Sequence, residues 1–280
     1  MQARYLTQRA LKIGSLALGR TTSAWRGVTV FTFHRVSAVP RSELELSPYS
    51  VHWMLRRIQR KFRLLSGDEF AQGIVEGRAW RRAALVTIDD AFEDAYSSFL
   101  PLLRELAAPA VMFVPTQFLD EPARAPVSYA FDPAKYRPCS WDQLREMAAD
   151  PLITLGAHSH RHDEAPELSP QELRADCVRH GAIFERERLP PARLYCYPRG
   201  KFSTQAAKVL AEFYVAGFAG APHHRLDGDL VNMAIPRVPL RGSDDGFFGW
   251  LKTGGFVTRE EALTEGLKAS LHRARPVTGQ

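Results

Sequence analysis

Residues 84–92 read ALVTIDDAF, an apolar run that ends in two adjacent aspartates, Asp89 and Asp90. Short runs of Val, Ile, Leu and aromatic residues are typical of strands buried in a parallel sheet. Comparable runs occupy residues 28–33, 110–114, 153–155, 194–197 and 213–218. Helix-like segments lie between them, at 51–62, 68–76 and 169–187. This alternation predicts an α/β fold with a parallel sheet, either open or closed into a barrel.

The composition is that of an ordinary globular protein, with 280 residues, 45% of them hydrophobic and 24% charged. A chain of this length can form one α/β barrel with a core that needs no disulfide or metal for stability. Its three cysteines are odd in number and show no CxxC spacing, which argues against a disulfide framework and a thiolate zinc site. We expect Cys139, Cys177 and Cys196 to be buried free thiols.

The formal net charge of +6 is concentrated near the start of the chain. The first acid is Glu43, and it follows Arg4, Arg9, Lys12, Arg20, Arg26, Arg35 and Arg41. Residues 3–19 could form a short amphipathic helix, either on an anionic membrane surface or solvated at the domain edge. Their apolar stretch is too short to span a bilayer, so we expect a cytoplasmic protein, which would contact the inner membrane face if this helix lies on the membrane. Nucleic acid is not expected as a partner, because acids are interleaved with the later positive residues.

The adjacent carboxylates of Asp89 and Asp90 suggest a cation site. Like charges at the end of a strand raise each other's pKa, and a divalent cation relieves that conflict. Such a pair can act as one metal ligand and one base. Two neighbouring aspartates alone are more often a solvated turn, but catalytic groups collect at the carboxyl ends of parallel strands.

Residues 156–162 read GAHSHRH and hold three of the nine histidines. His158 and His162, four residues apart, can converge on one metal ion. His160 could replace one of them or face solvent. Because a cluster of this kind follows a predicted strand, it indicates a site rather than isolated structural histidines.

Residues 195–200 read YCYPRG and follow another predicted strand. Pro198 and Gly200 would fix the backbone there. A backbone N–H near Tyr197 could then point at a developing oxyanion. The pattern is weak by itself, because Pro-x-Gly turns are common.

Together these three segments resemble the polysaccharide deacetylase family, also described as the NodB-homology or carbohydrate esterase family 4 group. The family motif T-F-D-D-G is similar to residues 87–91, H-[ST]-x-x-H is similar to 158–162, and F-A-Y-P-Y-G is similar to 194–200. The resemblance spans roughly residues 28–240. It implies a distorted (β/α) barrel of the NodB type at 27–245, between a basic amphipathic segment at 1–26 and a helical, basic tail at 246–280.

The resemblance also implies roles for individual residues. Asp89 would be the general base, and Asp90, His158 and His162 would bind a divalent metal, which we expect to be zinc. Tyr197, Pro198 and Arg199 would contact the substrate and stabilise the oxyanion. Ala91 replaces the motif glycine, and the arginine and tryptophan that flank the base elsewhere in the family have only loose candidates, Arg193 and Trp141.

The general acid is predicted at an unusual place. No L-x-H motif follows residue 240, but residues 31–36, FTFHRV, resemble the Y-H-R-[IV] segment of one branch of the family. That branch includes poly-N-acetylglucosamine deacetylases with a circularly rearranged fold. The resemblance implies that His34 is the acid, and the alternative is a histidine that only bonds a neighbouring loop.

These expectations predict a hydrolase that removes an N-acetyl group from an amino sugar in a surface polysaccharide or its lipid-linked precursor. One alternative keeps the fold and metal but makes the chain a deformylase or deacylase of a lipid-carried amino sugar. Another is a catalytically silent glycan-binding protein with the same fold. The altered glycine position and the missing flanking residues favour that last alternative.

Overall fold

A computed structural model describes residues 20–22, 24–122, 136–220, 226–244 and 246–258. Residues 1–19 and 259–280, and with them the whole of the predicted N-terminal helix and most of the basic tail, lie outside the described residues. The same holds for most of a proline-rich segment around 123–135.

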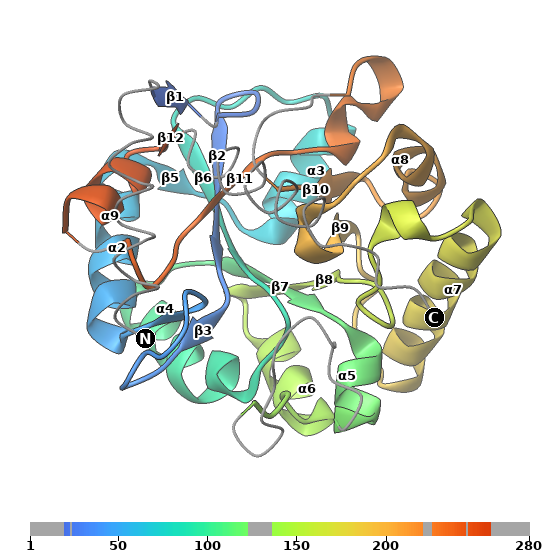
Figure 1. Ribbon diagram of the computed structural model, residues 1–280, viewed down its shortest axis with the longest axis horizontal. Coiled ribbons are helices and arrows are strands. Elements are labelled where there is room, and N and C mark those ends of the chain that lie inside the picture. Colours follow the sequence, from blue (N-terminus) through green and yellow to red (C-terminus); the bar gives the residue numbers. More distant parts are fainter. Residues whose placement is uncertain (1–19, 23, 123–135, 221–225, 245, 259–280) are drawn as a thin grey trace, which may run out of the picture.

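The central sheet has the order β10-β9-β8-β7-β6-β2-β11, and neighbouring strands in it run parallel. Its strands are β2 (Val28–Phe33), β6 (Ala83–Ile88), β7 (Ala110–Val114), β8 (Ile153–Ala157), β9 (Leu194–Cys196), β10 (Ala216–Phe218) and β11 (Arg237–Pro239). The short β5 (Arg63–Leu64) pairs with the first residues of β6. Figure 1 shows the strands crossing the middle of the molecule with helices around them.

The two edges of the sheet are joined by one segment of chain. Ile235 forms a parallel bridge with Phe218 at the end of β10. Two residues later the chain pairs with β2, where Arg237 lies opposite Val30. The sheet is therefore nearly closed, and the predicted (β/α) barrel is confirmed.

Helices and short strands surround the barrel. The α-helices are α2 (Pro48–Lys61), α3 (Gly67–Val75), α4 (Leu100–Leu106), α5 (Thr116–Asp120), α6 (Trp141–Ala149), α7 (Pro170–Arg186), α8 (Thr204–Leu210) and α9 (Gly246–Lys252). The other helical turns are η1 (Ala95–Phe99), η3 (Ala165–Glu167), η4 (Pro198–Gly200) and η5 (Gly228–Met233). The remaining strands are β1 (Arg20–Thr22), β3 (Arg35–Val36), β4 (Glu45–Leu46) and β12 (Phe256–Thr258).

The local signals in the sequence explain most of these boundaries. Helix α7 begins with a capping box, in which the Ser169 hydroxyl accepts from Glu172 N and the Glu172 carboxylate accepts from Ser169 N. The strand predicted at 213–218 is shorter than expected. Phe213 and Tyr214 donate backbone hydrogen bonds to Leu210, so they belong to the turn that ends α8.

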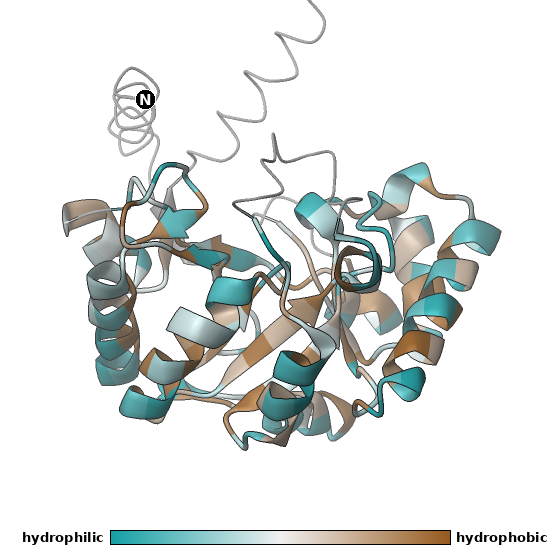
Figure 2. Ribbon diagram, turned by 90° about the horizontal axis from the view of Figure 1, so that it is seen from below, coloured by the Kyte–Doolittle hydropathy of each residue, from teal (hydrophilic) through white to brown (hydrophobic). Residues whose placement is uncertain are grey.

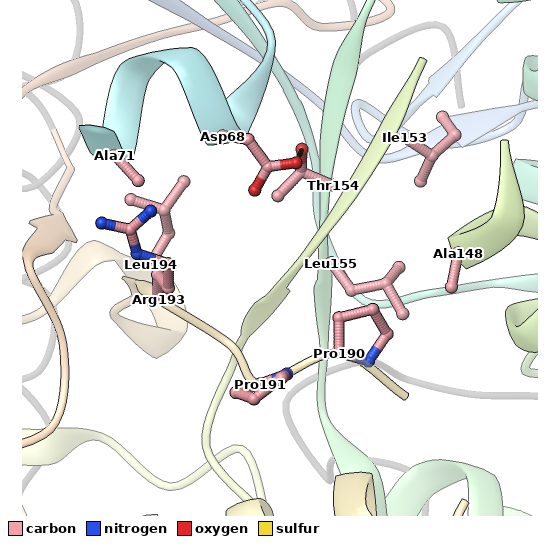
Figure 3. Close-up of a pocket in the computed structure, with 10 residues that line it drawn as sticks. All are labelled: Asp68, Ala71, Ala148, Ile153, Thr154, Leu155, Pro190, Pro191, Arg193 and Leu194. Atoms are coloured by element: carbon pink, nitrogen blue, oxygen red, sulfur yellow. Dashed lines mark hydrogen bonds between the residues drawn. The ribbon is translucent and has the colours of Figure 1, made fainter. Parts of the chain in front are cut away.

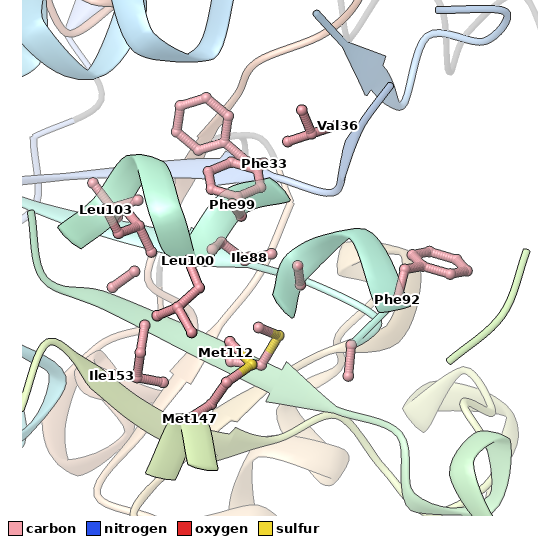
Figure 4. Close-up of a cluster of buried hydrophobic side chains, with 14 of the residues drawn as sticks. Phe33, Val36, Ile88, Phe92, Phe99, Leu100, Leu103, Met112, Met147 and Ile153 are labelled. Carbon is pink, nitrogen blue, oxygen red and sulfur yellow. The ribbon is translucent and has the colours of Figure 1, made fainter. Parts of the chain in front are cut away.

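The barrel interior is filled by aromatic and aliphatic side chains. Phe113 and Phe218 meet with ring centroids 5.4 Å apart, and Phe70 stacks on Trp80 at 5.4 Å. A second core lies between the sheet and the outer helices, where Phe33 contacts Phe99 at 5.3 Å (Figure 4). Figure 2 shows hydrophobic residues concentrated on the inner strands and hydrophilic ones on the surrounding helices. The barrel is thus a packed core, and chemistry must take place at its ends.

The chain beyond residue 245 packs against the barrel as far as the structure describes it. Helix α9 contacts α2 and β12, and β12 pairs antiparallel with β1. Arg20 consequently lies opposite Thr258. None of the helices in the described part of the chain is both long and apolar enough to cross a bilayer.

Candidate active site

The predicted site residues converge at the carboxyl ends of the strands. His34 follows β2, Asp89 and Asp90 follow β6, and His158 follows β8. His162 lies four residues further along the loop after β8. Parallel strands bring these three loops to one end of the barrel, where such folds place their catalytic groups.

Three side chains form a compact group of possible metal ligands. Asp90 Oδ1 lies 3.3 Å from His158 Nε2 and 3.4 Å from His162 Nε2. All three side chains are buried. Ligand atoms about 2.1 Å from a tetrahedral zinc ion lie roughly 3.4 Å from one another. The spacing of this Asp-His-His group therefore fits a zinc-sized ion.

The orientation of His158 is fixed by a hydrogen bond behind it. Its Nδ1 lies 2.8 Å from the carbonyl oxygen of Cys196, which can only accept. The Nδ1 atom therefore carries the proton in the neutral ring, and the lone pair of Nε2 faces Asp90. Metal-bound histidines are usually oriented in this way by a second acceptor.

Electrostatics keep Asp90 ionised although it is buried. Burial raises the pKa of Asp90, but hydrogen bonds and charge interactions with His158 and His162 outweigh it and hold the pKa well below its usual value. Burial lowers the pKa of His158, while Cys196 and Asp90 raise it, and the net shift is well upward. The group is therefore arranged around a buried anion.

A buried aspartate on α7 clamps the histidine loop. The backbone N–H of His160 donates to both Asp176 oxygens at 3.1 and 2.9 Å, and Ser159 Oγ donates at 3.3 Å. These bonds stabilise a loop in which Ser159 and His162 have φ angles of 65° and 61°. Left-handed backbone is unfavourable for residues other than glycine, so the loop needs such support.

His160 does not join the ligand group. Its Nδ1 lies 2.9 Å from Thr116 Oγ1, and the ring therefore faces α5. Of the two options that the sequence left open, substitution for a ligand and exposure to solvent, neither describes the structure, because the ring lies outside the ligand group but is half-buried against α5.

The backbone of the aspartate turn is strained at two consecutive residues. Asp90 has a φ of 74° and Ala91 a φ of 49°. The second value explains why glycine would be favourable at position 91. The Ala91 carbonyl accepts from Cys139 N at 2.8 Å, which helps to hold the turn in place.

Asp89 faces a different set of partners. Arg237 Nη1 donates to both oxygens of its carboxylate at 2.8 and 2.9 Å. His34 Nε2 lies 3.7 Å from Asp89 Oδ2, and the Cys196 thiol donates to the same oxygen at 3.7 Å. Burial raises the pKa of Asp89, but Arg237, His34 and His158 outweigh it, so the pKa lies below its usual value. The carboxylate is ionised and can accept a proton.

Arg237 was missed in the sequence, and Arg193, the loose candidate for the flanking arginine, is wrong. Arg193 lines a hollow at the amino ends of β8 and β9 (Figure 3), at the opposite end of these strands. Trp141 donates its Nε1–H to Asp120. The available signal was an arginine inside the apolar run of residues 235–239, since a buried arginine requires an acidic partner.

His34 is held next to Asp89 by the residue that follows it. Arg35 donates from Nε to Asp94 Oδ2 at 2.8 Å, and its guanidinium lies over the rings of Phe92 and Tyr136. Asp94 lies four residues after Asp90, so this ion pair ties the loop after β2 to the aspartate turn. Burial lowers the pKa of His34, and the nearby Asp89 and Asp90 oppose that shift.

The segment after β9 offers only one of its three predicted residues as an oxyanion donor. The Tyr197 N–H already donates to Phe218 O at 3.0 Å, and its ring packs against Tyr195 and Phe202. Pro198 has no N–H. Arg199 has a φ of 55°, and its guanidinium pairs with Glu164 at 2.8 Å. The backbone N–H of Arg199 is the remaining candidate.

A family model described as polysaccharide deacetylase matches residues 77–217. The chain belongs to the polysaccharide deacetylase family. The match covers the aspartate turn, the histidine loop and the segment after β9. It begins after His34 and ends before Arg237, so it covers neither of these two residues.

Solved structures agree with this deacetylase fold. IcaB from Ammonifex degensii aligns with a TM-score of 0.63 and 20% identity, over 82% of this chain and 97% of that chain. A de-N-acetylase from Aggregatibacter actinomycetemcomitans aligns with a TM-score of 0.63 and 18% identity, over 84% of this chain and 100% of that chain. The Streptococcus pyogenes deacetylase PplD aligns with a TM-score of 0.62 and 15% identity, over 77% of this chain and 92% of that chain. A comparison with curated protein sequences returned no match.

Proposed function

We propose that this chain is a metal-dependent hydrolase that removes the N-acetyl group from an amino sugar in a surface polysaccharide or its lipid-linked precursor. The observation that carries the proposal is the Asp-His-His group, with its 3.3 and 3.4 Å spacings, directly beside an ionised Asp89 that Arg237 holds in place. An open three-ligand site next to a free base is the usual arrangement for metal-assisted hydrolysis.

Asp90, His158 and His162 would hold the ion, and zinc suits two imidazoles and one carboxylate. A divalent ion there supplies Lewis-acid polarisation of the amide carbonyl and lowers the pKa of a bound water. Asp89 accepts the proton of the attacking water. Arg237 fixes the orientation of that carboxylate and keeps it deprotonated.

His34 would donate the proton that the leaving nitrogen needs. Its position supports this role, because its Nε2 lies 3.7 Å from Asp89 Oδ2. After one turnover Asp89 holds the proton from water and His34 has lost one to the amine. Transfer of the proton from Asp89 to His34 through one bridging water would restore both groups, since 3.7 Å is too long for direct transfer. The Arg199 N–H would stabilise the oxyanion of the tetrahedral intermediate.

Replacing Asp89 with asparagine tests this assignment. We expect Asp89→Asn to lose turnover on N-acetylglucosamine oligomers by at least about a hundredfold, since a positioned general base contributes that much. Metal content, measured by mass spectrometry, should stay unchanged. Deacetylation at the wild-type rate by Asp89→Asn would contradict the role of Asp89.

The same assay separates the alternative functions. Release of formate instead of acetate would favour a deformylase of a lipid-carried amino sugar. Bound metal without hydrolysis of any acylated sugar would favour a silent glycan-binding protein. A cytoplasmic location at the inner membrane face, with contact through the basic N-terminal segment, is part of our proposal for a lipid-linked substrate.

A further inference from the structure

A band of aromatic and basic side chains lies on the outer surface of α2 and α9, on the side of the barrel. We call it the α2–α9 band, and it consists of Tyr49, Trp53, Arg57, Lys61, Phe247 and Trp250. The four residues on α2 follow one another at intervals of four, which places them along one side of the helix. Figure 1 shows α9 beside α2 on one side of the barrel.

Large apolar groups in this band are exposed. Tyr49 is 78% exposed, Phe247 55% and Trp250 46%. The two α9 rings stack at 6.3 Å with an interplanar angle of 19°. Exposed apolar side chains that gather in one place mark an interaction surface.

The cations of the band lie against its rings and have no acidic partner among the described residues. Arg57 is 5.3 Å from the Trp53 ring centroid and 5.5 Å from that of Trp250, and Lys61 is 5.6 Å from that of Trp250. Arg56 and Arg60 flank the band on α2 and likewise form no ion pair within the described part of the chain. The surface therefore combines aromatic rings with unneutralised positive charge.

This combination fits an anionic lipid surface better than a sugar chain. A sugar ring stacks on an uncovered aromatic face, but Trp250 already has Phe247, Arg57 and Lys61 around its ring. Trp and Tyr side chains are suited to the boundary between lipid headgroups and acyl chains. Lysine and arginine beside them bind anionic headgroups.

Both ends of the described chain leave the barrel next to this band. Helix α9 contacts β12, and β12 pairs with β1 so that Arg20 lies opposite Thr258. Residues 1–19, with Arg4, Arg9 and Lys12 and no acid, are thus joined to the barrel at the same side. The basic N-terminal segment is therefore attached to the barrel beside the α2–α9 band, and the positive charge of both favours an anionic surface.

We propose that the α2–α9 band binds the surface of a bilayer that contains anionic phospholipid. The proposal deepens the membrane contact included in the proposed function and gives it a second, folded surface. It orients the barrel so that its side, rather than its catalytic end, rests on the lipid. A lipid-linked glycan could then reach the site while the carboxyl end stays open.

Vesicle binding by the full-length protein tests the proposal without measuring hydrolysis. We expect sedimentation with phosphatidylcholine vesicles only when they contain phosphatidylglycerol, and less of it at high salt. Arg60→Glu should weaken this binding roughly 25-fold, since each charge near an anionic surface contributes about fivefold and the substitution changes the net charge by two. Phe247→Ser should weaken it as well, because it removes an exposed ring without changing charge.

Lys208→Glu is the matched control, because Lys208 is an exposed residue of α8, across the barrel from α2 (Figure 1). It makes the same change in charge and should leave binding within about twofold of wild type, because a remote charge is screened. A full-length variant with Arg4, Arg9 and Lys12 changed to glutamine shows how much of the vesicle binding depends on the N-terminal segment.

Three outcomes overturn the proposal. The first is no binding to phosphatidylglycerol vesicles, and the second is equal effects of Arg60→Glu and Lys208→Glu. The third is that the N-terminal variant loses all binding while Arg60→Glu binds as well as wild type. Activity of the same samples on N-acetylglucosamine oligomers shows whether the proposed hydrolysis fails separately.

Discussion

The two ends of the barrel are built from similar residues in different arrangements. The amino end is closed by the packed rings of Trp25, Phe70 and Trp80, and its Asp68 and Arg193 line only a shallow hollow (Figure 3). At the carboxyl end, Asp89 and Arg237 are buried in direct contact, and Asp90 is buried against His158 and His162. Buried charge reduces stability unless it is compensated. The charged groups buried at this end indicate that it serves chemistry, and the packed rings at the other end indicate that it serves folding.

Removing one arginine from each end gives the largest expected contrast. Arg237→Leu leaves Asp89 buried without its cation, which should lower the free energy of unfolding by about 3–5 kcal/mol and abolish turnover. Arg193→Leu should change stability by less than about 1 kcal/mol and leave activity intact, because Arg193 has no such buried partner. Denaturant unfolding and the deacetylase assay measure both variants. Equal stability of the two would show that the Asp89–Arg237 pair has no special role.

Acidification should destabilise the carboxyl end through a residue that the mechanism does not use. His180 is buried on α7 with its Nε2 3.1 Å from Val114 O, and burial, with smaller effects of His160 and His158, lowers its pKa to about 4. Below pH 6.5 the unfolded chain binds a proton at this position that the folded protein excludes. Stability should therefore fall by about 3 kcal/mol between pH 7 and pH 4 from this group. In His180→Gln the side-chain amide can still donate to Val114 but does not titrate. Its free energy of unfolding, measured in denaturant titrations, should therefore fall by about 3 kcal/mol less than that of wild type between pH 7 and pH 4.

The clamp on the histidine loop should have a smaller effect, confined to metal affinity. Asp176→Asn keeps one acceptor oxygen but replaces the other by an amide that cannot accept from His160 N. Loss of such a supporting contact typically weakens metal binding about 10- to 100-fold. Competition with a zinc chelator measures the affinity, and Asp68→Asn at the amino end is the control. An unchanged dissociation constant for Asp176→Asn would mean that the loop holds its shape without the clamp.

The sequence predicted features that depend on neighbouring residues better than features that depend on residues far apart in the chain. The interior strands were predicted because a strand buried on both faces is apolar along most or all of its length, as in residues 110–114. The prediction extended β10 too far because Phe213 belongs to the same apolar run but ends the preceding helix. Closure of the sheet through Ile235 depends on pairing between residues far apart in the chain, which no local pattern records.

The same distinction holds for the site. Asp90, His158 and His162 come from short segments with recognisable spacing, and the structure brings them together as expected. Arg237 is 148 positions from Asp89 and belongs to no such segment, so only the closed barrel reveals the contact. The N–H of Tyr197 looked available in the sequence, but pairing with β10 occupies it.

Zinc titration of metal-free protein tests the central claim most directly. We expect wild type to bind one ion per chain and His160→Ala to do the same, since the His160 ring faces Thr116. Asp90→Ala and His162→Ala should each bind zinc at least about a hundredfold more weakly, because each removes one of three ligands. Wild-type affinity in either of these two variants would contradict the proposed metal site.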